Sequence, residues 1–108
     1  MAQHDLGNLD QAVTVYSEAI AIEQEDINPY TNRAIVYTTL AKYNLAADDM
    51  DRVFEINPTY AKGYLVRANA YAKLGMKAQS QADIDQAVAL GIDRAKAETS
   101  IAELAPSP

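Results

Sequence analysis

Residues 27–60 read INPYTNRAIVYTTLAKYNLAADDMDRVFEINPTY, and residues 61–94 read AKGYLVRANAYAKLGMKAQSQADIDQAVALGIDR. These consecutive stretches of 34 residues follow the same pattern. Identical residues recur at this step in the pairs Tyr30 and Tyr64, Arg33 and Arg67, Ala34 and Ala68, Tyr37 and Tyr71, Leu40 and Leu74, Asp49 and Asp83, and Asp51 and Asp85. A fixed period of roughly 20 to 50 residues indicates a repeat architecture, so this period decides the fold class.

Each repeat is expected to form two helices. Apolar residues recur at helical spacing on both sides of a short break, which lies near residues 42–44 in the first stretch and at Gly75 in the second. The pair Asn28-Pro29 predicts the start of one helix, and Asn57-Pro58 predicts the end of the next.

The two ends of the chain depart from the complete repeat. In the same register Gly7 is a turn, so residues 8–24 are expected to form the second helix of a first repeat that retains only 1–6 of its first helix. Gly91 is expected to cap a helix end, and Asp93 to begin a last helix. The sequence predicts one domain, 1–108, with an incomplete first repeat (1–26), two complete repeats (27–60 and 61–94), a capping helix (95–104) and a tail (105–108).

The composition favours packed helices and excludes several functions. Of 108 residues 20 are Ala, the best helix former, whereas only 4 are Gly and 4 Pro. Without Cys there is no thiol nucleophile or Cys-ligated metal, and His4 is the only His. The 15 acidic against 9 basic side chains, a net charge of -6, argue against nucleic-acid binding. No apolar run approaches the ~18 residues of a membrane span. We therefore expect a soluble protein that is not an enzyme and that uses no cofactor, metal, nucleic acid or membrane. The composition does not fix its location, although a cytoplasmic one is favoured.

The repeats resemble the tetratricopeptide repeat, or TPR. The residues that fill its pattern are Tyr30, Ala34, Tyr37, Ala46, Val53 and Pro58 in one repeat and Tyr64, Ala68, Tyr71, Gly75 and Ala87 in the next. Departures are Arg33 and Arg67 where Leu is frequent, Ser80 for Ala, and Ile92 for the closing Pro. The resemblance implies an all-α solenoid of antiparallel helix pairs, whose first helices line a concave face and whose second helices line the convex one.

Charge separates between the two kinds of helix. The first helices of the complete repeats hold Arg33, Lys62, Arg67 and Lys73 without an acid, whereas the second helices are strongly acidic. With the TPR arrangement, this predicts a relatively positive inner face that attracts acidic partners. Alternatively, each arginine pairs with the aspartate sixteen residues later, as Arg33 with Asp49, and supports the scaffold instead.

A narrower resemblance concerns the carboxylate-clamp TPR domains of co-chaperones, which hold the acidic carboxy-terminal tails of large heat-shock chaperones. It rests on residues 7–10 (GNLD), 16–20 (YSEAI), 30–33 (YTNR) and 61–64 (AKGY). Asn32 and Lys62 match two of the five clamp positions, and Val66 stands where the family has an Arg. The other two positions fall in the missing helix. The resemblance implies that Asn32 and Lys62 hold a carboxylate.

The predicted function is therefore protein-protein interaction, with an extended peptide bound in the groove of the first helices. The predicted contacts are Asn32, Lys62, Leu65, Val66, Asn69, Ile35, Thr31 and Lys73. The alternative for these positions is a plain exposed helix surface without a ligand.

A second surface is expected on the helix over residues 8–24. Its apolar side, with Val13, Tyr16 and Ile20, would lack the helix that normally precedes it. Uncovered apolar patches often mark interfaces. The chain is then either part of a longer array or an assembly scaffold that pairs with a second copy of itself through these residues.

Overall fold

The computed structural model describes the backbone of residues 2–104 and the side chains of residues 7–99. Over this range the chain is helical and has no strand, so the predicted all-α fold is confirmed. The helices are α1 (Ala2–Ile22), α2 (Ile27–Thr39), α3 (Tyr43–Ile56), α4 (Ala61–Lys73), α5 (Lys77–Ala89) and α6 (Arg94–Leu104). In this part of the chain none of the helices combines the length and the apolar character needed to span a membrane. The predicted tail, 105–108, and the His4 side chain lie outside the described residues.

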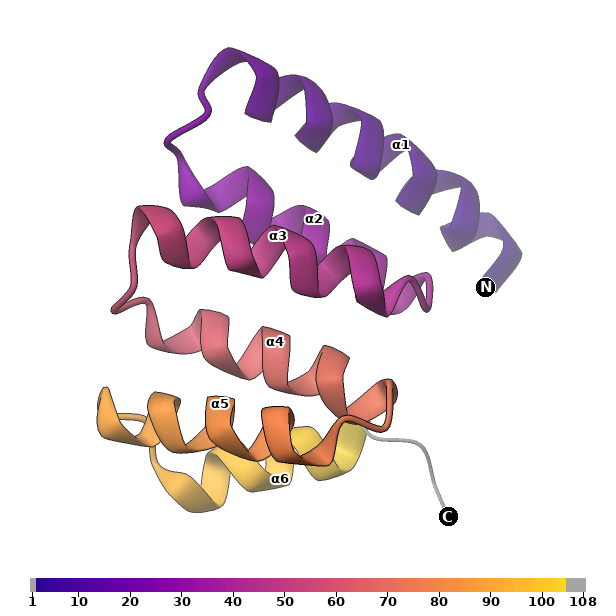
Figure 1. Ribbon diagram of the computed structural model, residues 1–108. Coiled ribbons are helices and arrows are strands. Elements are labelled where there is room, and N and C mark those ends of the chain that lie inside the picture. The colour runs from indigo at the N-terminus through magenta and orange to yellow at the C-terminus, as the bar shows by residue number, and fades with distance from the viewer. Residues whose placement is uncertain (1, 105–108) are drawn as a thin grey trace.

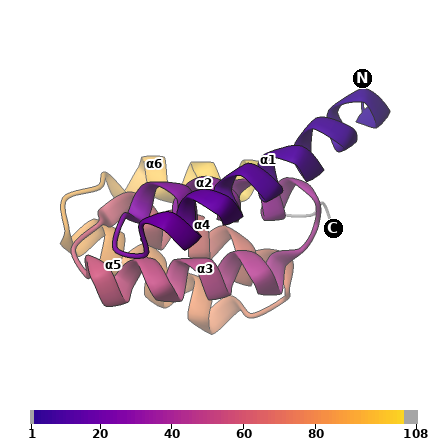
Figure 2. The same ribbon diagram turned by 90° about the horizontal axis from the view of Figure 1, so that it is seen from above.

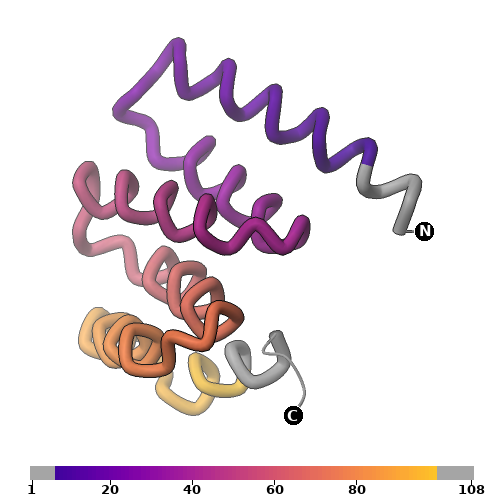
Figure 3. Tube along the Cα trace, turned by 45° about the vertical axis from the view of Figure 1, so that its right-hand side comes forward, coloured from indigo at the N-terminus to yellow at the C-terminus, as the bar shows by residue number. Residues whose placement is uncertain are grey.

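The helices stack as successive antiparallel pairs (Figure 1). Helix α2 packs against α3, and α4 packs against α5, while α1 lies on α2 and α3 lies on α4. Helix α2 also contacts α4, and α4 also contacts α6, so these three form an inner layer. Figure 2 shows α2 and α6 on one side of the molecule and α3 and α5 on the other. The chain zigzags between the layers through short turns (Figure 3).

Left-handed residues end the helices at the turns, as the sequence predicts for two of them. Gly75 has a φ of 78° and Gly91 a φ of 112°, and each directly follows a helix C-cap. One repeat before Gly75, the same conformation is taken by Ala41, with a φ of 62°. Lys42 N–H then donates to the Tyr37 carbonyl at 2.8 Å, which closes the turn without glycine.

Two of the described helices, α2 and α6, begin at aspartate caps. The Lys96 N–H donates to Asp93 Oδ1 at 3.0 Å, which confirms the predicted cap of the last helix. At α2, however, the Asn28 N–H donates to Asp26 Oδ1 at 3.0 Å, so the helix begins at Ile27. The predicted start at Asn28-Pro29 is therefore slightly late, because the aspartate supplies the cap that we assigned to the asparagine.

Helix α1 corrects the predicted first repeat. It runs without interruption from Ala2 to Ile22, so Gly7 lies inside a helix and not at a turn. A glycine in a helix costs about 1 kcal/mol relative to alanine. Gly7 is not among the residues with a positive φ, so helical hydrogen bonding continues through it.

The core is built largely from alanine, which lets the helices approach closely. Six alanines are completely buried: Ala34, Ala46, Ala68, Ala70, Ala87 and Ala97. One core cluster joins α2, α3 and α4 around Met50 and Val53, and a second joins α4, α5 and α6 around Ile84. Gly63 serves the same close approach, since a Cβ there would lie 2.9 Å from Phe54 Cε1 and 3.0 Å from Met50 Cε.

Candidate functional site

Each complete repeat is held by an arginine of its first helix. Arg67 donates through Nε and Nη2 to the two oxygens of Asp83 at 2.9 and 2.7 Å, and Arg33 binds Asp49 in the same way at 2.8 and 2.5 Å. Both aspartates are buried. The hydrogen bonds to Asp83 raise the pKa of Arg67, which therefore stays charged. The interpretation of these arginines as scaffold residues is confirmed.

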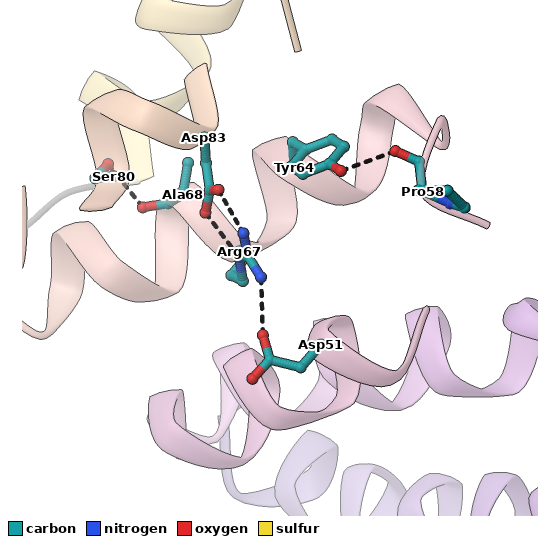
Figure 4. A network of polar contacts seen from close by, with 7 residues as sticks. All are labelled: Asp51, Pro58, Tyr64, Arg67, Ala68, Ser80 and Asp83. Atoms are coloured by element: carbon teal, nitrogen blue, oxygen red, sulfur yellow. Dashed lines mark hydrogen bonds and ion pairs between the residues drawn. The ribbon is translucent and has the colours of Figure 1, made fainter. Parts of the chain in front are cut away.

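The same arginines also reach the preceding unit, which the sequence pattern did not lead us to predict. Arg67 Nη1 donates to Asp51 at 2.8 Å, and Arg33 Nη1 donates to Ser17 Oγ at 3.0 Å. Arg67 thus lies between Asp83 of its own repeat and Asp51 of the previous one (Figure 4). The sequence does contain a signal for these contacts, because Asp51 and Ser17 each precede their arginine by sixteen residues.

These pairs reduce the positive charge expected on the inner face. Arg33 and Arg67 are bound to carboxylates of the outer layer, so the expectation that both add charge to the groove is wrong. Lys62 and Lys73 of α4 remain, and no residue of the described range forms an ion pair with either lysine. Among the described residues of α2 and α4, the cations without an ion pair are therefore these two lysines.

On α4 the predicted contacts opposite Arg67 share one face. At 100° per residue, Lys62, Asn69 and Lys73 lie about 200–240° around the helix from Arg67, on the side away from the outer layer. Lys62 is exposed and Lys73 is half-buried, whereas Asn69 is only 5% exposed. Lysine stems can cover apolar surface while the ammonium groups stay in water.

On α2 the structure separates the predicted contacts. Asn32 is exposed, and Ile35 is 49% exposed, so both are accessible from solvent. Thr31 is buried, and its hydroxyl donates to the Ile27 carbonyl at 2.9 Å within its own helix. Because α2 contacts α4, Asn32 and Ile35 stand on the helix next to Lys62.

Leu65 and Val66 belong in part to the core. Val66 packs against the cluster around Met50, and Leu65 packs against the cluster around Ile84. Both remain half-buried. They flank the face that carries Lys62, and their remaining exposed surface is the part that a ligand can cover.

On α1 the exposed apolar residues differ from those predicted. Ile20 packs against the cluster around Met50, and Val13 and Tyr16 are half-buried. The large exposed side chains are instead Val15 and Ile22, at 59% and 87%. Helix α2 covers the side with Ile20, and no other helix of the described residues packs on the opposite side of α1.

Two sequence models of one family match the chain. The model described as TPR repeat matches residues 2–40, and the model described as Tetratricopeptide repeat matches residues 27–60 and 61–90. Together these matches extend from α1 to the end of α5.

Among curated proteins, the chain is similar to a tetratricopeptide repeat and J domain-containing co-chaperone of Cryptococcus neoformans, with 30% identity over 91% of this chain. It is also similar to the mitochondrial import receptor subunit TOM70 of Rattus norvegicus, with 34% identity over 72% of this chain. The chain spans only 18% and 14% of the length of these relatives.

Solved structures share the fold. The TPR domain of Arabidopsis OM64 has a TM-score of 0.81 and 26% identity, with 95% of this chain and 85% of that chain covered. The first TPR of Spaghetti (RPAP3), solved with the HSP90 peptide SRMEEVD, has a TM-score of 0.83 and 23% identity, with 94% and 80% covered.

Proposed function

Because this chain belongs to the tetratricopeptide repeat family, whose domains mediate protein-protein interactions, we propose that it binds an extended peptide with an acidic carboxyl end on the inner face of α2 and α4. The single observation that carries this proposal is the exposed pair Asn32 and Lys62 on adjacent inner helices. Arg33 and Arg67 do not compete with this pair for a carboxylate ligand, because both arginines are bound to aspartates of the outer layer.

The chemistry of the pair suits a carboxylate. An ammonium group and an amide donor both hydrogen-bond to carboxylate oxygens, and charge-assisted bonds are roughly twice as strong as neutral ones. Ile35, which is 49% exposed on the same layer, offers an apolar surface for one side chain of the peptide. A peptide that combines terminal carboxylates with an apolar residue therefore fits this face best.

A solved domain of the same fold was determined with a peptide of this chemistry. The RPAP3 domain was solved with SRMEEVD, whose last four residues carry three side-chain carboxylates, a valine and the terminal carboxylate. Since that likeness shows the fold alone, the proposal for this chain rests on its own lysine, amide and exposed isoleucine. SRMEEVD is nevertheless a suitable probe.

Lys62→Ala is expected to weaken binding of a labelled SRMEEVD peptide about tenfold or more, because a hydrogen bond to a charged group is lost. The matched control is Lys77→Ala, which removes an exposed lysine from α5 of the outer layer and should leave the affinity unchanged. Fluorescence anisotropy measures both. Equal losses in the two variants would mean that only overall charge matters, and would contradict the proposed site.

A second candidate function is self-association through α1, and the repeat register favours it. Asp49 and Asp83 bind the arginines of their own repeats, but the residue 34 positions before Asp49 is Val15, which is 59% exposed. A helix that covers α1 therefore needs an apolar residue opposite Val15, and an arginine would stay unpaired there. The α1 helix of a second copy meets this requirement. Antiparallel pairing centred on Val15 also places Glu18 of each copy opposite Ala12 of the other copy. The two Glu18 carboxylates therefore do not face each other.

If α1 pairs in this way, Val15→Glu should shift a dimer to a monomer, because two carboxylates would meet at the centre of the interface. Size-exclusion chromatography with light scattering measures the mass. Glu18→Gln, on the same helix, serves as the control and should keep the dimer. A wild-type protein that stays monomeric at high concentration would exclude this candidate.

A further inference from the structure

At one position of the repeat, the apolar residue is exposed and the polar residue is buried. Ile35 on α2 and Asn69 on α4 are 34 residues apart, so they occupy equivalent places on the inner face. The apolar Ile35 is 49% exposed, whereas the polar Asn69 is only 5% exposed. In folded proteins the apolar side chain is normally buried and the polar one exposed. The unliganded protein is therefore less stable at this position than the opposite choice of residues would make it.

The Asn69 side chain has an unsatisfied acceptor. Its Oδ1 atom is buried and has no hydrogen-bond partner. A carbonyl oxygen removed from water is destabilising until a donor reaches it. A group that brings such a donor would therefore gain more at Asn69 than at an exposed amide.

We infer that Asn69 is a ligand-binding residue whose Oδ1 accepts a hydrogen bond from a backbone N–H of the bound peptide, while an apolar side chain of the peptide covers Ile35. This inference rests on the proposed peptide-binding function and specifies two of its contacts. The bond that turns an asparagine amide is a soft torsion, so the oxygen can rotate toward an incoming donor. An extended peptide leaves its N–H groups free of internal hydrogen bonds.

The spacing along α4 indicates which N–H is used. Asn69 follows Lys62 by seven residues, which is about 10 Å along a helix. An extended chain covers that distance in about three residues. With the terminal carboxylate at Lys62, the donor is therefore expected about three residues before the carboxyl end of the peptide.

Asn69→Leu separates this role from a structural one, because the two roles predict opposite changes in stability. Leucine is close to asparagine in shape and removes the unpaired oxygen, so the melting temperature should rise by about 5 °C. Affinity for SRMEEVD should fall about tenfold, or about 1.4 kcal/mol. Asn69→Ala, which adds no bulk, should weaken binding similarly. Gln86→Leu, an amide replaced by leucine on an exposed part of α5, should not change the affinity.

Probes that carry one N-methylated backbone nitrogen identify the donor. One of them, near the third residue from the carboxyl end, should lose affinity for the wild type but not for Asn69→Leu. Equal losses in both proteins would overturn the inference, as would a lower melting temperature of Asn69→Leu or an unchanged affinity for the unmodified probe. If the wild type does not bind SRMEEVD, the proposed function fails and the inference with it, and this outcome is recognised from the wild type alone.

Discussion

Asp83→Ala is expected to lower the free energy of unfolding by about 2–3 kcal/mol and the melting temperature by about 10–15 °C. Asp83 is 4% exposed and accepts two hydrogen bonds from Arg67, which would be left without its buried partner. Breaking a fully buried pair costs about 3–5 kcal/mol. The lower value applies here because Arg67 is 20% exposed and keeps its bond to Asp51.

Asp51→Ala is the matched control for the same arginine. Asp51 is 56% exposed, so its ion pair with Arg67 is screened by water and should contribute about 1 kcal/mol or less. Urea and thermal unfolding followed by circular dichroism compare the two variants. Equal destabilisation by both would contradict the view that the buried carboxylate, and not the number of pairs, anchors the repeat.

Met50→Ala is the second change with a large expected effect, about 3 kcal/mol of destabilisation. Met50 has 0% exposure and lies at the centre of the cluster that joins α2, α3 and α4. Its Cε would lie 3.0 Å from a Cβ at Gly63, so the surrounding helices are already close together. They cannot collapse much further, and a cavity would remain.

Met76→Ala is the matched control, because Met76 is 36% exposed at the turn between α4 and α5. It should lower stability by less than about 1 kcal/mol. Both variants are measured by the same urea titration. A similar loss in both would contradict the view that the burial of Met50 determines the cost of its removal.

The 34-residue period predicted the pairing of α2 with α3 and of α4 with α5, because its apolar positions and its turn residues agree. Gly75 ends α4 as expected, and Asp93 caps α6 as expected. The Arg67 pair with Asp83 was also predictable, because the offset of sixteen residues recurs in both repeats and links the two helices of one repeat.

The features that sequence could not predict depend on what surrounds each helix. Gly7 has the residue type of a turn, but α1 continues through it as a helix. Likewise the periodic pattern assigned Ile20 to an uncovered side, whereas α2 covers it and leaves Val15 exposed. The sequence pattern predicts that Asn69 is an exposed amide of the inner face. The structure shows instead that its side-chain oxygen is buried.

The scaffold and the proposed site are therefore separated across each inner helix. On α4, Arg67 anchors the outer layer, and Lys62 and Asn69 lie on the opposite side. Changes in the anchor should destabilise the repeat, whereas changes on the inner side should alter binding without loss of stability.

The central claim, that the inner face binds a terminal carboxylate, is tested most directly by titrating the wild-type protein with labelled SRMEEVD and with the same peptide amidated at its carboxyl end. We expect amidation to weaken binding about tenfold or more, and added salt to weaken binding of the free acid more than that of the amide. Equal binding of the two peptides, or binding of neither, would contradict the central claim.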